Sequence, residues 1–228
     1  MVDYSATQIA ANRAALYHWF ALALFAPPTE TEVTDLQSGR AQGLLLSLAA
    51  TPGAEHGIEA MRRVLASGTA HGVASVLGAA HARLFYGVGA YEAALPYRSI
   101  YTSERGLLCQ QATAEMERVL RQHRLRLENT VCEPADHLSI QLEVMSQLAT
   151  RFAEAVEQGE SVLASLRTEQ ADFLSRQILS WLAEFVNRVG VIDELGYHAG
   201  LASVLLAVLE QDLAYLGETP STNASADT

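Results

Sequence analysis

The chain has 228 residues, and half of them are hydrophobic, which is enough material for one large folded domain or two small ones. The formal net charge is −11, and all fifteen basic residues are arginine, because the sequence contains no lysine. These facts exclude lysine Schiff-base chemistry and a Walker A phosphate loop. The acidic balance also argues against nucleic acid or an anionic membrane surface as the main partner, and it suits a basic partner.

The sequence predicts a cytoplasmic protein without membrane insertion. No apolar run reaches the roughly 18 residues that a membrane-spanning helix needs. The first residues carry an acid and no basic region, which is unlike a signal peptide. The two cysteines, Cys109 and Cys132, have a spacing that matches no zinc or redox motif. We expect both to be small buried or half-buried residues without a metal.

Apolar residues recur at helical spacing along nearly the whole chain. In 5–25, large apolar side chains follow one another at three- and four-residue steps, and Pro27 and Pro28 end that helix. The same pattern predicts further helices over 31–49, 55–67, 71–86, 104–126, 135–157, 161–188 and 194–216. No stretch alternates in the two-residue manner of a strand, so the predicted fold class is all-α, with about eight to ten helices.

Two segments interrupt the helical pattern. Residues 86–104 contain glycines, Pro96 and four tyrosines, and residues 126–137 contain the sequence RLENTVCEPADH. The second break divides the chain into an N-terminal helical half, 1–125, and a C-terminal helical half, 138–216. The tail, 217–228, is small and polar, and we expect it to be disordered.

The cluster Glu133, Pro134, Asp136 and His137 has a simple interpretation as the start of a helix. Proline favours the first helical position, which would make Glu133 the N-cap and Asp136 the third helical residue. Both carboxylates would then lie at the positive end of the helix dipole. An apolar stripe follows, made of Leu138, Leu142, Met145, Ala149 and Phe152. Capping does not account for His137, because a charged histidine is unfavourable in the first turn.

Catalytic interpretations of the same cluster have less support. Asp136 and His137 are adjacent on the expected helix, so their side chains diverge by about 100° and do not converge on a metal. The chain has no Gly-x-Ser-x-Gly element for a hydrolytic triad. A helical enzyme that uses Asp136 and His137 as an acid–base pair remains the alternative hypothesis, and a helical nucleic-acid-binding regulator, which the charge opposes, is a second.

The other break and one basic helix also allow two interpretations each. The sequence LPYRSIY fits a packed loop, and it also fits an apolar groove for a peptide. Arg118, Arg121 and Arg124 follow a rough three-residue spacing. This spacing is typical of a solvated helix face, and an anion site is the alternative.

The two breaks together carry a resemblance to a known family. The sequence RLFYGVG…LPYRSIY, followed by EPADHLSIQLEVMSQL, resembles the TorD/DmsD family of molybdoenzyme chaperones, and most of all TorD. The opening RAALYHWFALALFAPP is similar to the first helix of that family. FLSRQILSWLAEFVNRV and YHAGLASVLLAVLEQDLAYL are similar to its last two helices. The resemblance extends to about residue 216.

The resemblance implies an all-helical cytoplasmic chaperone that is not an enzyme and holds no cofactor of its own. Such proteins bind the apo catalytic subunit of a molybdenum oxidoreductase, and often its twin-arginine signal peptide. They keep the apoenzyme ready for the molybdopterin cofactor before export. A trimethylamine N-oxide reductase is the first expectation for the client, and the molybdenum cofactor biosynthesis machinery is a further expected partner.

The resemblance also assigns residues. It places a hinge between the two halves at 126–137, where domain-swapped dimers form, and its motif residues here are Glu133, Pro134, Asp136 and His137. It implies a client- and peptide-binding groove formed by Leu84, Phe85, Pro96, Tyr97, Ser99, Tyr101, Glu133, Asp136 and His137. Carboxylates beside an apolar loop suit a peptide with adjacent arginines and an apolar run, because arginine–carboxylate pairs are charge-assisted.

Overall fold

The computed structural model of the chain describes residues 5–89, 92–127, 132–159 and 161–218. In these ranges the fold is all-α, as predicted, and its only β-type pairing is one isolated bridge. The elements are α1 (Ala6–Phe25), α2 (Glu30–Gln37), α3 (Gly39–Ala49), α4 (Glu55–Leu65), α5 (Ala70–Tyr86), α6 (Arg98–Thr102), α7 (Gln111–Gln122), α8 (Leu138–Glu157), α9 (Leu163–Phe173), the π-helical turn η1 (Leu174–Leu179), α10 (Ser180–Ile192) and α11 (Tyr197–Gly217).

Three predicted helices are shorter or more divided than the periodicity indicated. The helix expected over 31–49 is split at Ser38, whose extended backbone ends α2 before α3 begins. The helix expected over 104–126 begins only at Gln111, because Gly106 and Cys109 both have a positive φ that a right-handed helix does not allow. The helix expected over 161–188 contains the π turn η1 between α9 and α10.

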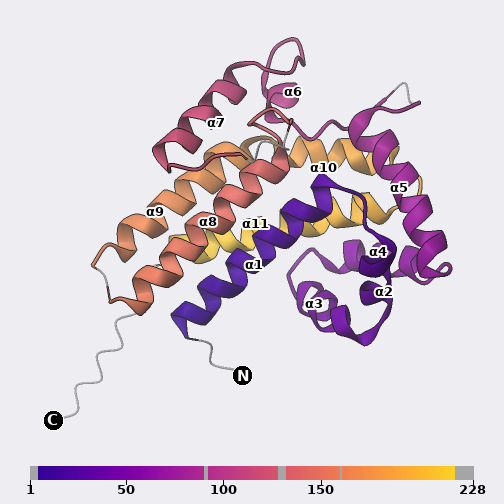
Figure 1. Cartoon of the computed structure of the whole chain (residues 1–228), viewed down its shortest axis with the longest axis horizontal. Helices are drawn as coiled ribbons and strands as arrows, with labels where there is room; N and C mark the ends of the chain where they lie inside the picture. The colour runs from indigo at the N-terminus through magenta and orange to yellow at the C-terminus, as the bar shows by residue number, and fades with distance from the viewer. Residues whose placement is uncertain (1–4, 90–91, 128–131, 160, 219–228) are drawn as a thin grey trace.

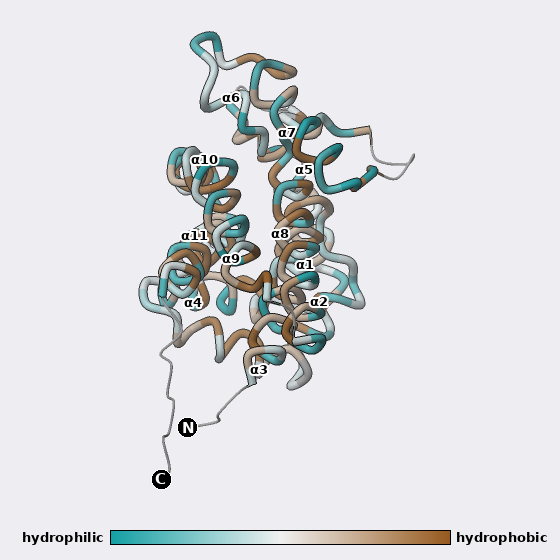
Figure 2. The backbone as a smooth tube through the Cα atoms, turned by 90° about the vertical axis from the view of Figure 1, so that its left-hand side faces the viewer, coloured by the Kyte–Doolittle hydropathy of each residue, from teal (hydrophilic) through white to brown (hydrophobic). Residues whose placement is uncertain are grey.

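The long helices pack side by side around one core. α1 lies along α8, and α9 covers the other side of α8 (Figure 1). α11 packs against α4 and α10, while α2, α3 and α4 form a group of short helices at one end of the molecule. α6 and α7 lie together at the opposite end from α3, which is clear in the view of Figure 2.

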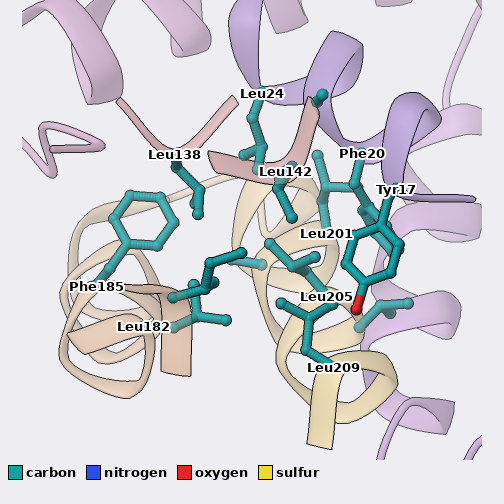
Figure 3. Packing of buried hydrophobic residues seen from close by; sticks show 14 of the residues in the cluster. Tyr17, Phe20, Leu24, Leu138, Leu142, Leu182, Phe185, Leu201, Leu205 and Leu209 are labelled. Atoms are coloured by element: carbon teal, nitrogen blue, oxygen red, sulfur yellow. The ribbon is translucent and has the colours of Figure 1, made fainter. Parts of the chain in front are cut away.

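The core joins helices from both sides of the second break. Figure 3 shows Tyr17 and Phe20 of α1 facing Leu142 of α8 and Leu205 of α11, with Phe185 of α10 nearby. Helices of 1–125 and of 138–216 therefore share one hydrophobic cluster. The hinge predicted at 126–137 includes residues 128–131, which lie outside the described residues, as do 219–228 of the tail, so both remain predictions.

The crossing of α4 and α11 depends on two glycines. A Cβ atom built on Gly57 would lie 2.7 Å from the carbonyl oxygen of Gly200, and one built on Gly200 would lie 2.5 Å from the carbonyl oxygen of Gly57. Both distances are too short for real atoms, so the two backbones approach this closely only because neither residue has a side chain.

The structure shows where the apolar helix α11 and the two cysteines of the sequence lie. Among the described residues, α11 is long and apolar enough to cross a membrane by length and composition, but in this fold it packs in the core against α4 and α10. Cys109 and Cys132 are both free and exposed, which corrects the expectation of burial. That expectation rested on the usual burial of free cysteine, whereas both residues lie in irregular segments between helices.

Candidate functional site

The two breaks in the helical pattern meet in space. Tyr97 and His137 form the isolated antiparallel bridge. The N–H group of Leu138 donates to the carbonyl oxygen of Pro96 at 2.8 Å, and the N–H group of Arg98 donates to the carbonyl oxygen of Asp136 at 3.2 Å. We call the paired segments 96–101 and 133–141 the clamp. The clamp fixes the start of α8 to the start of α6.

Asp136 caps α6 and not α8, which corrects the capping scheme expected from the sequence. Its Oδ2 accepts from the N–H group of Ser99, in the first turn of α6, at 2.8 Å. Its Oδ1 accepts from the hydroxyl group of Thr113, on α7, at 2.6 Å. Asp136 is fully buried, and each carboxylate oxygen has a hydrogen-bond donor. Its carboxylate therefore joins α6, α7 and the entry to α8.

His137 is the actual N-cap of α8, whereas the sequence predicted Glu133 for this position and Pro134 for the first helical residue. The Nδ1 atom of His137 accepts from the N–H group of Ser139 at 3.1 Å, so the ring acts as an acceptor. Burial lowers the pKa of His137 to about 4, and the nearby carboxylates of Glu133 and Asp136 oppose that shift. A neutral histidine removes the conflict with the helix dipole that the sequence raised.

A buried polar network extends the clamp to the C-terminal helices. Gln141, on the buried face of α8, donates from Nε2 to the carbonyl oxygen of Asp136 at 2.9 Å. The Nε1–H group of Trp181 is shared between Oε1 of Gln141 at 3.3 Å and the carbonyl oxygen of Gln177 at 2.8 Å. Oε1 of Gln177 accepts from Nη1 of Arg98 at 2.7 Å, which closes the network. Segments far apart in the sequence are thus joined through paired polar groups.

Glu133 and its neighbours form the outer edge of the clamp. The hydroxyl group of Tyr97 donates to Oε2 of Glu133. Glu133 is only partly buried. Burial, and then this hydrogen bond, raise the pKa of Tyr97 well above its ordinary value. Tyr86 and Val88 are 48% and 63% exposed. Partial burial, and then the charge of Glu133, raise the pKa of Tyr86 above its ordinary value. The edge therefore presents one carboxylate beside an exposed aromatic ring, and the exposed Val88 follows that ring by two residues in the chain.

The nine residues predicted for the groove fall into two groups. Two are partly exposed, Tyr101 and Glu133. The other seven are buried: Leu84, Phe85, Pro96, Tyr97, Ser99, Asp136 and His137. Leu84 and Phe85 belong to the main core cluster. Direct contact between a peptide and the seven buried residues would require the clamp to open.

Aromatic and histidine rings fill the space beneath the clamp. The ring of Tyr97 packs edge-on against His137 with centroids 4.9 Å apart. His81, Phe85 and His198 contact one another, and the ring of His81 has its centroid 4.9 Å from that of Phe85 and 5.7 Å from that of His198. Burial lowers the pKa values of His81 and His198 to about 4. Neither of these two rings makes a hydrogen bond within standard geometry to the described part of the protein.

The arrangement offers no support for catalysis by Asp136 and His137. The oxygens of Asp136 are engaged by Ser99 and Thr113, and the Nδ1 atom of His137 is engaged by its own helix. Both residues are buried. Within the residues that the structure describes, no group of three or more His, Cys, Asp or Glu side chains could hold a metal ion.

Sequence reasoning missed the partners that hold the clamp. Thr113, Gln141, Gln177 and Trp181 were not singled out, and Arg98 was seen only as part of the loop. One of them carried a visible signal: Gln141 is a polar residue flanked by Ile140 and Leu142 in the apolar start of α8. A polar side chain at such a position must find a buried partner.

The chain is similar to named proteins over nearly its whole length. Residues 49–187 match the family described as the nitrate reductase delta subunit. Chaperone protein TorD of Vibrio parahaemolyticus is 30% identical over 209 residues, which cover 90% of this chain and 94% of that protein. Chaperone protein TorD of Vibrio cholerae is 30% identical over 211 residues, covering 91% and 93%. Chaperone protein TorD of Photobacterium profundum is 26% identical over 206 residues, covering 90% and 94%.

Proposed function

The chain belongs to the TorD/DmsD family of chaperones, and from this premise we propose that it binds the apo catalytic subunit of a molybdenum oxidoreductase and its twin-arginine leader peptide. The first candidate client is a trimethylamine N-oxide reductase. In this proposal the chaperone acts in the cytoplasm and holds the client until the molybdopterin cofactor has been inserted. The relatives are named chaperones, so the chain is not an enzyme, and the acid–base hypothesis for Asp136 and His137 is discarded.

One observation carries the proposal for the leader: a partly exposed carboxylate lies beside exposed aromatic and apolar surface at the clamp edge. Glu133 supplies the charge, Tyr86 supplies the aromatic neighbour, and the exposed Val88 lies two residues beyond Tyr86 in the chain. A leader peptide with two arginines and an apolar run would place a guanidinium on Glu133 and the apolar run along the neighbouring surface. The net charge of −11 would favour the approach of such a basic segment.

The buried residues of the predicted groove take a supporting role in this proposal. Asp136 fixes the position of α6, and His137 fixes the start of α8, so both hold the segment that carries Glu133. Leu84 and Phe85 form the core beneath. A domain-swapped homodimer across 126–137 remains part of the proposal, since α8 would leave with the C-terminal half if that segment straightened.

Isothermal titration calorimetry with the leader peptide of the client tests this proposal. The glutamate variant Glu133→Gln should weaken binding by about 1 kcal/mol, or about fivefold, because one charge-assisted pair at a partly exposed position is lost. A matched control is Glu157→Gln, an exposed glutamate at the far end of α8, about 30 Å along the helix at 1.5 Å per residue. It should leave the affinity unchanged.

A version of the peptide with two lysines in place of the arginines completes the experiment. It should bind the wild-type protein more weakly, and Glu133→Gln should then make little further difference, because lysine cannot form the bidentate pair. Equal affinities for both peptides in all three proteins would place the leader elsewhere and refute the role of Glu133.

A further inference from the structure

A pocket lies between the N-terminal and C-terminal helical halves of the chain, away from the clamp edge. Its volume is ≈ 660 Å³, and it is lined by α6 and α7 on one side and by η1 and the start of α10 on the other. Arg98, Glu115 and Arg118 line it from the N-terminal half. Arg176 and Gln177 line it from the C-terminal half. A ligand in this pocket would therefore touch both halves.

The charge of this pocket opposes the charge of the chain. Three arginines and one glutamate line it, in a protein whose net charge is −11. Arg118 is exposed and has no side-chain hydrogen bond within the described residues, and its charge acts on Glu115. Arg176 is 76% exposed and lies 3.8 Å from Asp172, an exposed i,i+4 pair of the kind that contributes little. Both guanidinium groups are thus able to turn toward a ligand.

Arg98 is the fixed element of the pocket. Its Nη1 donates to Oε2 of Glu115 at 2.7 Å and to Oε1 of Gln177 at 2.7 Å, and its side chain is only 14% exposed. The hydrogen bond from Arg98 lowers the pKa of Glu115. The Nε–H group of Arg98 is buried and meets no acceptor from the described protein. Because that group is closed to solvent, Arg98 acts on a ligand in the pocket through the charge of its guanidinium group, held in place by Glu115 and Gln177.

The π turn shapes the side of the pocket that belongs to the C-terminal half. η1 spans Leu174–Leu179, and it carries Arg176 and Gln177, while Ser180 follows at the start of α10. Single π turns inside longer helices often occur at functional sites, because they change the direction of side chains along the helix. Here the turn delivers an arginine and two neutral polar groups to one pocket.

We propose that this pocket binds a phosphate-type oxyanion, which Arg98, Arg118 and Arg176 hold jointly between the two halves. Guanidinium groups present paired N–H donors that match the oxygens of a phosphoryl group. The three arginines of the lining outnumber its one glutamate, so the lining carries a net positive charge that suits an anion. The backbone N–H group of Arg98 also donates to the carbonyl oxygen of Asp136, so the pocket adjoins the clamp.

Pyrophosphate is the probe that tests this inference, with calorimetry and thermal unfolding at constant ionic strength. The wild-type protein should bind it, and the unfolding temperature should rise by about 5–10 °C at a hundredfold excess over Kd. Arg118→Ala combined with Arg176→Ala changes only exposed side chains, so the fold should hold, and the affinity should fall at least tenfold. The control Arg121→Ala, an exposed arginine on the same helix, should behave like the wild type.

Three results would overturn the inference. The first is no binding of pyrophosphate, or equal binding by the double variant. The second is an equal response to chloride at matched ionic strength, which indicates general screening of charge. The third is tighter binding of a glutamate-rich peptide than of pyrophosphate in the same pocket, which would assign the pocket to an acidic polypeptide. None of these outcomes depends on the leader-binding proposal, so the two can fail separately.

Discussion

Replacing Asp136 by alanine should destabilise the protein strongly, because one carboxylate holds three elements together. The change leaves the N–H group of Ser99 and the hydroxyl group of Thr113 without their acceptor in a buried site. A buried donor without a partner costs about 1–3 kcal/mol. The expected loss is therefore about 2–6 kcal/mol in the free energy of unfolding. For a chain of this length, 3 kcal/mol corresponds to about 6–12 °C in the unfolding temperature.

Asparagine at the same position should cost less, about 1–2 kcal/mol. Its carbonyl oxygen can still accept from the N–H group of Ser99, and its amide group can donate to the hydroxyl oxygen of Thr113, which is able to accept. Thr113→Val should lower the free energy of unfolding of the wild-type protein and should hardly change that of the Asp136→Ala variant. The difference between these two effects measures the coupling of the pair.

Urea unfolding followed by circular dichroism and by tryptophan fluorescence measures these free energies. The control is Asp172→Ala, an exposed aspartate in an i,i+4 pair with Arg176, which should change stability by less than about 0.5 kcal/mol. A loss below about 1 kcal/mol for Asp136→Ala would refute the view that this carboxylate anchors the clamp.

Three further predictions concern stability and assembly. Burial lowers the pKa of His81, His137 and His198 to about 4, so the unfolded chain binds more protons than the folded protein between pH 4 and about 6.5. The free energy of unfolding should therefore be highest above this window. It should fall as the pH drops through the window, by up to about 4 kcal/mol per pH unit. Urea titrations across the window measure the slope, and a flat profile would contradict the burial of these rings. Gly200→Ala should cost at least about 2 kcal/mol in thermal unfolding, because its Cβ would meet the carbonyl oxygen of Gly57 at 2.5 Å, and an unchanged unfolding temperature would show that α4 and α11 can separate freely. Size-exclusion chromatography at high concentration should separate a monomer and a slowly exchanging dimer, and one species at all concentrations would count against the swap.

Most of the helices could be predicted because their apolar side chains recur at a clear helical period. The predicted helix boundaries are wrong where the backbone departs from α-helical geometry, because the order of apolar side chains does not indicate such a departure. Cys109 adopts a positive φ although nothing in its side chain requires it, and η1 continues the apolar pattern of its helix through a π turn. Both lie inside stretches that the periodicity assigns to a single helix.

The clamp shows how tertiary pairing overrides a local rule. Pro134 favours the first turn of a helix, yet α8 begins four residues later, because the bridge between Tyr97 and His137 keeps the preceding residues extended or in a turn. The same pairing takes Asp136 away from α8 and gives it to α6. The motif lies at the entry to a helix, but its contacts depend on a segment about forty residues earlier in the chain, which no local pattern reveals.

Hydrogen exchange of the chaperone, measured with and without its client's leader peptide, tests the central claim most directly. If the clamp edge is the binding surface, backbone amides of 96–101 and 133–141 should exchange more slowly in the complex, and those of α3 and α4 should be unchanged. The Glu133→Gln variant should show the same pattern with less protection at equal peptide concentration. Protection confined to other elements, with the clamp unaffected at saturating peptide, would contradict the account.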